Sequence, residues 1–134
     1  MSTAASVLVV DDSQGICQTM SLILKRKGFD VECVLDGPAA IEKARQRPYD
    51  VVLLDIRLPG MDGVEVFRRL KPALPGTRFA MMTAYALEDK VRAALEGGAE
   101  KVFYKPLDME TVIGFISGGG APERGNAAPM PRSG

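Results

Sequence analysis

The sequence contains no histidine, only two cysteines, and equal numbers of acidic and basic residues. Cys17 and Cys33 form no CxxC motif, so the chain gives little support for a zinc site or a catalytic thiol, and both are expected to be reduced core residues. The formal net charge of zero gives no reason to expect binding to nucleic acid, an anionic membrane or a strongly acidic partner. Function must therefore be sought in local clusters of charge.

Long hydrophobic runs are also absent. The apolar runs at residues 7–10 and 51–54 are far shorter than the roughly 20 residues that cross a bilayer. Residues 1–6 carry no basic segment of the kind that opens a signal peptide. The sequence therefore predicts a soluble, cytoplasmic protein without membrane contact, and 134 residues correspond to one ordinary domain.

Apolar runs of strand length alternate along the chain with segments of helical period. This alternation is typical of repeated β-α units, in which helices cover both faces of a parallel sheet. Strands are expected at residues 6–10, 29–34, 50–54, 77–82 and 101–104. Helices are expected at residues 13–27, 38–46, 64–73, 87–96 and 108–116. The fold class is therefore α/β, with a doubly wound sheet.

Residues 117–134 differ in composition from the rest of the chain. They are rich in glycine and proline and nearly empty of large apolar side chains, so they cannot bury enough surface to order themselves. We expect one domain over residues 1–116, followed by either a disordered tail or the start of a linker.

Polar residues directly follow four of the five predicted strands. Asp11 and Asp12 follow the first strand, Asp55 the third, Thr83 the fourth and Lys105 the fifth. Because the carboxyl ends of parallel strands meet at one edge of a sheet, and ligands collect there, these five side chains are expected to converge.

Three carboxylates in one shallow pocket repel one another by about 4 kcal/mol for each close pair at a protein surface. A hard divalent cation would offset that repulsion, and Mg2+ takes carboxylates together with water and phosphate oxygens. A hydroxyl at Thr83 and an ammonium at Lys105 suit an anionic phosphoryl group. One aspartate could then act as a nucleophile that forms an acyl phosphate.

Each of these features has a simpler explanation when taken alone. An acidic pair can end a strand and cap a helix, and an aspartate or threonine is ordinary in a turn. Lys105-Pro106 alone is a common turn dipeptide. Only the joint arrangement at four strand ends favours a functional site.

Four segments carry a resemblance to a known family: VLVVDDS, VVLLDIRLPGMDG, MMTAYA and VFYKPL. In this order and spacing they resemble the receiver domain of bacterial two-component response regulators, over roughly residues 7–116. The resemblance implies a flavodoxin-like fold with strand order 2-1-3-4-5, and a phosphoryl group received from a sensor histidine kinase or a histidine phosphotransfer protein. The absence of histidine fits, because the donor imidazole would belong to the partner.

The resemblance also implies roles for individual residues in the metal site. Asp55 would be the phosphoacceptor, and Asp12, Asp55 and the backbone carbonyl of Arg57 would bind Mg2+. Asp11 would act through water. The domain would be a signalling module that catalyses only its own phosphorylation and dephosphorylation.

A second group of residues would contact the phosphoryl group or control access to it. Thr83 would hydrogen-bond the phosphoryl group, small Ala84 would leave a path for the donor, and Lys105 would pair with a phosphoryl oxygen. A cis Lys105-Pro106 bond would aim that lysine. Arg57 and Tyr85 either shield the aspartyl phosphate from water or are simply exposed polar residues.

Two departures from the family concern the output. Val102 occupies the position that often holds an aromatic switch residue, so Tyr104 is left either to pack or to face a partner. The expected helix at residues 108–116 has no arginine or lysine, so the dimer contacts of the winged-helix subfamily are not evident and a DNA-binding output has no support. A phosphorylation-dependent homodimer remains open.

By analogy, the surface for a downstream effector is the face made by the fourth helix, the fifth strand and the fifth helix. The candidate residues on this face are Val91, Ala94, Lys101 and Tyr104.

Three other classes compete with this interpretation. A phosphatase of the haloacid dehalogenase type needs a second aspartate two residues after the nucleophile, where this chain has Arg57. A flavodoxin-like flavin binder needs a glycine- and hydroxyl-rich phosphate loop, where Asp11 and Asp12 would repel the phosphate. A receiver-like module that is never phosphorylated would not need all five polar residues.

Overall fold

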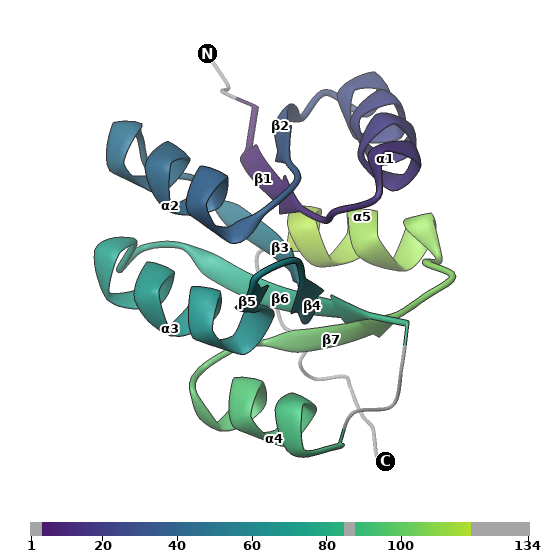
Figure 1. The fold of residues 1–134 in the computed structure, drawn as a ribbon. Helices are drawn as coiled ribbons and strands as arrows, with labels where there is room; N and C mark the ends of the chain where they lie inside the picture. The colour runs from purple at the N-terminus through teal and green to yellow at the C-terminus, as the bar shows by residue number, and fades with distance from the viewer. Residues whose placement is uncertain (1–3, 85–87, 119–134) are drawn as a thin grey trace.

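The computed structural model describes residues 4–84 and 88–118, and its centre is a five-stranded parallel sheet (Figure 1). The strands of this sheet are β1 (Ser6–Val10), β2 (Asp30–Val34), β3 (Val51–Asp55), β6 (Arg78–Thr83) and β7 (Lys101–Tyr104). Their order is β2-β1-β3-β6-β7, and every neighbouring pair is parallel. When the strands of this sheet are counted along the chain, the order is 2-1-3-4-5. This confirms the predicted doubly wound arrangement.

Five helices cover the two faces of the sheet. They are α1 (Gln14–Arg26), α2 (Gly37–Gln46), α3 (Gly63–Ala73), α4 (Glu88–Glu96) and α5 (Met109–Gly118). Figure 1 shows α1 and α5 on one side of the sheet and α2, α3 and α4 on the other. No helix within the described ranges is long and apolar enough to cross a membrane.

Helix starts follow from local capping chemistry. The Ser13 hydroxyl accepts a hydrogen bond from the backbone N–H of Ile16 at 3.2 Å, which ends the β1–α1 loop and begins α1. Asp36 caps α2 in the same way through Ala39, and Pro38 occupies the first turn of that helix.

The core has two halves because side chains of each strand alternate between the faces. Val7 and Val9 of β1 pack with α1 and α5, whereas Leu8 and Val10 pack with α2 and α3. All four are fully buried. A strand that is buried on both faces gives the continuous apolar run seen in the sequence.

A small hairpin after β3 was not predicted. Its strands, β4 (Arg57–Leu58) and β5 (Met61–Asp62), pair antiparallel across a turn in which Gly60 has a φ of +70°. At its end Gly63 lies against β3, and a Cβ there would come within 2.6 Å of the Ile56 Cα. This close approach fixes the loop that follows Asp55.

Element boundaries differ from the prediction by one or two residues. Asp55 is the last residue of β3 rather than the residue after it, and α5 continues through residues 117–118. The rest of the expected tail, residues 119–134, lies outside the described residues, as do Tyr85 and Leu87.

The expectation for the cysteines was wrong. Cys17 of α1 and Cys33 of β2 form a disulfide, with Cα atoms 5.8 Å apart. Cys17 is buried, but Cys33 is only partly buried. Cys33 lies on the same face of β2 as Val31, the face that α1 covers, so the two thiols meet across the helix–sheet interface. This contact cannot be recognised from the spacing of the two residues along the chain.

Candidate functional site

Three carboxylates converge at the carboxyl edge of the sheet. Asp11 and Asp12 directly follow β1, and Asp55 ends the neighbouring strand β3. One oxygen from each lies within 4.8 Å of the others. Asp11 and Asp55 are buried, whereas Asp12 is exposed to solvent. The predicted convergence of these three residues is therefore present in the structure.

Lys105 brings a positive charge into this cluster from β7, two strands away from β3. Its Nζ lies 2.7 Å from Oδ2 of Asp55 and 2.7 Å from Oδ2 of Asp11. The Lys105-Pro106 peptide bond is cis, as the resemblance implies. The lysine therefore bridges two acids in this state of the protein, and would have to exchange one of them for an incoming anion.

Backbone N–H groups hold the other oxygen of each buried acid. The Arg57 N–H donates to Oδ1 of Asp55, and the Ser13 N–H donates to Oδ1 of Asp11, both at 2.9 Å. These bonds orient the carboxylates from the loops that follow β3 and β1. The Ser13 contact gave no recognisable signal in the sequence, because it depends on the shape of the loop.

Burial and charge act against each other at this site. Burial raises the pKa of the Asp55 carboxyl and the charge of Asp11 adds to that effect, while Lys105 and the Arg57 N–H oppose it, leaving the pKa above its ordinary value. Burial alone would lower the pKa of Lys105, but its interactions with Asp11 and Asp55 outweigh burial and raise the pKa. The lysine therefore stays charged at neutral pH.

The cluster fits a divalent cation. Oδ2 of Asp11 is buried and pairs with Lys105, whose Nζ also pairs with Asp55. Lys105 supplies one positive charge against three carboxylates. All the ligand atoms of the cluster are oxygens, its negative charge exceeds the positive charge of Lys105, and Asp12 is open to solvent. A hard cation such as Mg2+ binds to sites of this kind together with water. Asp12 and Asp55 would hold such an ion directly, and Asp11 would act through water.

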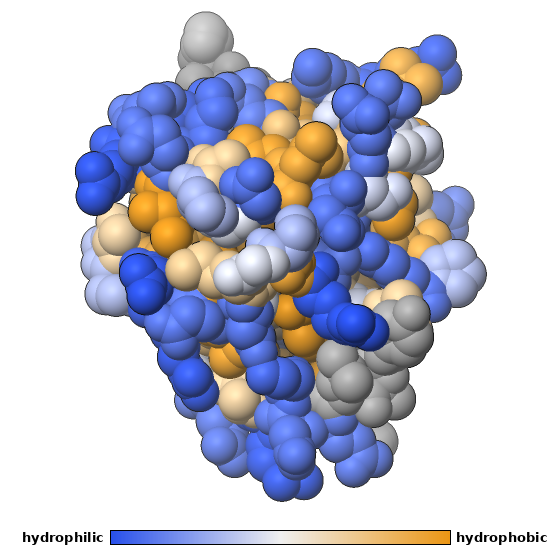
Figure 2. All heavy atoms as spheres, viewed as in Figure 1, coloured by the Kyte–Doolittle hydropathy of each residue, from blue (hydrophilic) through white to orange (hydrophobic). Residues whose placement is uncertain are grey.

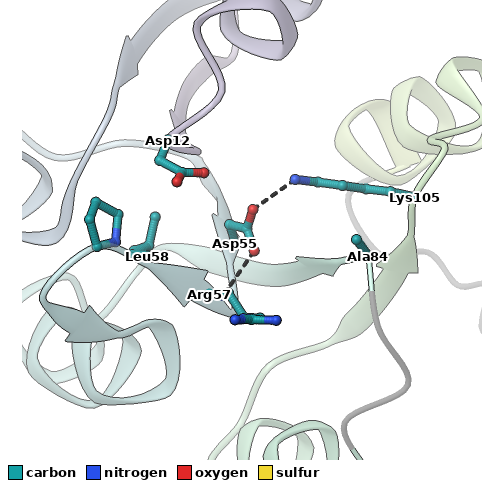
Figure 3. A pocket seen from close by; sticks show the side chains of 7 residues that line it. Asp12, Asp55, Arg57, Leu58, Ala84 and Lys105 are labelled. Atoms are coloured by element: carbon teal, nitrogen blue, oxygen red, sulfur yellow. Dashed lines mark hydrogen bonds and ion pairs between the residues drawn. The ribbon is translucent and has the colours of Figure 1, made fainter.

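The cluster opens into a cleft of about 410 Å3 (Figure 3). Figure 3 shows Lys105 reaching toward Asp55 from one side, with Asp12 on another side of the same space. The cleft is lined by Asp12, Asp55, Arg57, Leu58, Pro59, Ala84 and Lys105. Leu58 was not singled out from the sequence, because its place here depends on the β4–β5 hairpin.

Thr83 occupies a different position from Ala84. It ends β6 and is fully buried, and its backbone carbonyl accepts the Lys105 N–H at 2.8 Å. Ala84, the next residue, lines the cleft. Both residues therefore lie near Lys105, and the small side chain of Ala84 faces the opening of the cleft.

The residues named for a partner surface divide into exposed and buried ones. Tyr104 is 53% exposed and Lys101 is also exposed, whereas Val91 is partly buried against the core. Ala94 is fully buried, so its assignment to a partner surface was wrong. It packs in the core between α4 and the sheet.

Comparison with known proteins decides the family. The family model for the response regulator receiver domain matches residues 7–117. The chain belongs to this family. The receiver domain is a signalling domain of two-component response regulators, and the predicted class is confirmed.

Two curated relatives and one solved structure illustrate the similarity. Sporulation initiation phosphotransferase F of Bacillus subtilis is 33% identical over 79% of this chain and 86% of that protein. Transcriptional regulatory protein ZraR of Klebsiella oxytoca is 38% identical over 78% of this chain and 24% of that protein. A CheY-like receiver domain protein from Methanospirillum hungatei has a TM-score of 0.81 and 26% identity, over 87% of this chain and 97% of that one.

Several curated relatives are much longer than this receiver domain, which spans between 24% and 48% of their length. The rest of each of these relatives lies outside the region that matches this chain.

Proposed function

We propose that this receiver domain accepts a phosphoryl group onto Asp55 in a Mg2+-dependent reaction, from the phosphohistidine of a sensor histidine kinase or a histidine phosphotransfer protein. The observation that carries the proposal is the Lys105 bridge, in which one ammonium lies 2.7 Å from both buried acids beside the exposed Asp12. The positive charge of Lys105 offsets only part of the negative charge of the three acids, and a cation would offset the rest. We place the exchange in the cytoplasm.

In the transfer, an oxygen of Asp55 bonds to phosphorus while the bond from phosphorus to the imidazole nitrogen breaks. The imidazole leaves with the electron pair of that bond and takes up a proton. Asp12, Asp55 and the Arg57 backbone carbonyl would hold Mg2+ with Asp11 acting through water, and the ion would supply positive charge to the phosphoryl oxygens. The chain supplies the acceptor, and the partner supplies the histidine that this sequence lacks.

The remaining residues would position the phosphoryl group. Lys105 would move one of its contacts from an acid to a phosphoryl oxygen, and the Thr83 hydroxyl would turn toward the same group. Ala84 lines the cleft with a single methyl group, so a donor imidazole can approach Asp55 past it. No acidic residue stands two positions after Asp55, where a phosphatase of the aspartate-nucleophile class would need its acid-base group, because Arg57 is there.

Phosphorylation would shift a two-state equilibrium of the face formed by α4, β7 and α5. Tyr104 and Lys101 are exposed there and are the residues offered to a downstream effector or to a second phosphorylated copy. The domain itself would contact neither nucleic acid nor membrane. Figure 2 shows hydrophilic residues over most of one side of the molecule, with apolar ones visible in patches between them.

Intact-mass spectrometry after incubation with acetyl phosphate tests the proposal. We expect one phosphoryl adduct in the presence of Mg2+ and none when the ion is chelated. Asp55→Asn should abolish the adduct. Asp30→Asn is the matched control, because Asp30 is an exposed aspartate at the opposite end of β2 and should leave the adduct intact. An adduct that survives in Asp55→Asn would overturn the assignment of the acceptor.

A further inference from the structure

The two cysteines meet beside the acidic cluster. The Cys17–Cys33 disulfide joins α1 to β2, and the Sγ of Cys17 lies 3.5 Å from the backbone carbonyl oxygen of Asp11. Asp11 is joined to β2 as well, because its N–H donates to the Val34 carbonyl at 3.1 Å. The disulfide therefore lies directly behind the segment that carries two of the three acids.

The segment between the acids and the disulfide, residues 11–17, is short and is held by hydrogen bonds. The Cys17 N–H donates to the Ser13 carbonyl at 3.0 Å, and the Ser13 N–H donates to Oδ1 of Asp11 at 2.9 Å. Asp11 in turn forms the ion pair with Lys105. A change in how tightly α1 is held to β2 would therefore reach the site through one turn of helix.

A separate pocket of about 500 Å3 lies against the disulfide. Both cysteines line it, together with Lys25, Lys43 and Glu32. Lys43 forms an ion pair with Glu32 at 3.2 Å, and the three charged side chains sum to one positive charge. A small thiol or disulfide that carries carboxylates would therefore be attracted to this opening.

We propose that Cys17 and Cys33 form a reversible dithiol–disulfide site that sets the Mg2+ affinity of the acidic cluster. In oxidation, the two thiols lose two protons and two electrons as the S–S bond forms, and a small-molecule disulfide accepts them and becomes two thiols. In reduction, the reverse exchange proceeds through a mixed disulfide. Disulfides of cytoplasmic proteins are typically transient and redox-sensing, so a pair placed here is suited to regulation.

The oxidised form should bind Mg2+ more tightly. The disulfide restricts the start of α1 and the loop before it, so Asp11 and Asp12 lose less conformational freedom when they bind the ion. Reduction frees Cys17 from Cys33 and restores that freedom. We expect reduction to weaken Mg2+ binding about fivefold, which is at the low end of coupling between two sites.

Thiol trapping tests the redox site on its own. The protein is equilibrated in buffers of reduced and oxidised glutathione, alkylated with a maleimide and weighed by mass spectrometry. Reduced protein should take up two maleimides and oxidised protein none, with the change occurring in one step. Protein that takes up two maleimides in every buffer would overturn the proposal.

Calorimetric titration of Mg2+ into the oxidised and reduced wild type tests the coupling and needs no variant. The Cys17→Ser and Cys33→Ser variants should bind like the reduced form and ignore the redox buffer. Equal affinity of the two wild-type forms would overturn the coupling. The consequence for signalling rests on the proposed function, and the two failures are distinguishable: a protein that switches its thiols but never acquires a phosphoryl adduct refutes the proposed function alone.

Discussion

The two edges of the same sheet differ in how completely their polar side chains are paired. At the amino edge, Ser6 and Asp50 satisfy each other: the Ser6 N–H donates to Asp50 Oδ2 at 2.8 Å, and the Asp50 N–H donates to the Ser6 hydroxyl at 3.0 Å. The Thr77 hydroxyl likewise donates to the Tyr49 carbonyl. At the carboxyl edge, three acids lie together, and Lys105 forms ion pairs with two of them, Asp11 and Asp55.

This difference indicates which edge is built for stability and which for chemistry. A closed polar network stabilises the fold, since every buried group keeps a partner. A partly satisfied cluster of like charges costs stability and is retained where a ligand completes it. Substitutions at the two edges should therefore separate stability from phosphorylation.

The largest expected effect is at the carboxyl edge. Lys105→Met removes the charge between two buried acids, so phosphorylation by acetyl phosphate should slow by about 100-fold. The free energy of unfolding at neutral pH should fall by about 3 kcal/mol because both acids lose their partner. Intact-mass time courses and urea denaturation measure the two quantities.

Lys101→Met is the control for this change, since Lys101 is an exposed lysine at the start of β7, the strand that directly precedes Lys105. It should leave both quantities nearly unchanged. Phosphorylation of Lys105→Met at the wild-type rate would contradict the role of the bridge.

At the amino edge the effect should be on stability alone. Asp50→Ala removes the acceptor of two Ser6 hydrogen bonds, so the free energy of unfolding should fall by about 2 kcal/mol. The phosphorylation rate of the folded variant should match the wild type. Asp30→Ala breaks only an exposed ion pair with Arg47 and should cost less than about 1 kcal/mol. A slower phosphorylation of Asp50→Ala would show that the two edges are coupled.

A smaller and pH-dependent effect is expected at Tyr49. Its hydroxyl donates to Glu32, and this hydrogen bond is the main cause that lowers the pKa of Glu32 below its ordinary value of 4.5. A lowered folded-state pKa stabilises the fold above the unfolded-state pKa, and that stability is lost as the pH falls through the folded-state pKa. Tyr49→Phe should therefore cost about 1 kcal/mol at pH 7.

The difference in stability between Tyr49→Phe and the wild type should narrow as the pH falls below about 4.5, the ordinary pKa at which Glu32 of the unfolded chain is protonated, and should vanish once the pH is below the lowered pKa of Glu32 in the folded protein. Denaturation curves at several pH values measure it. A difference that stays constant over this range would mean that the tyrosine acts by packing, not through the charge of Glu32.

Much of the fold could be predicted because its signals are local. Ser13 and Asp36 are recognisable caps, and strands buried on both faces produce apolar runs such as residues 51–54. The β4–β5 hairpin could not be predicted, since strands of two residues are too short to show a period. The disulfide was missed because it depends on how α1 packs on β2.

The candidate site was predictable as a set of residues but not as a set of contacts. Strand ends identify Asp11, Asp12, Asp55 and Lys105, and parallel strands bring such positions together. That Lys105 bridges Asp11 and Asp55 depends on side-chain rotamers and on burial. The burial of Ala94 likewise depends on how α4 packs, because a helical stripe alone does not tell core from surface.

Calorimetric titration of Mg2+ tests most directly whether the acidic cluster at the carboxyl edge binds a metal ion. The account predicts one binding site in the wild type and a loss of affinity of about tenfold or more in Asp12→Asn, while Asp30→Asn binds like the wild type. Equal Mg2+ affinity in Asp12→Asn and the wild type would contradict it, because the exposed acid of the cluster would then contribute nothing to binding the ion.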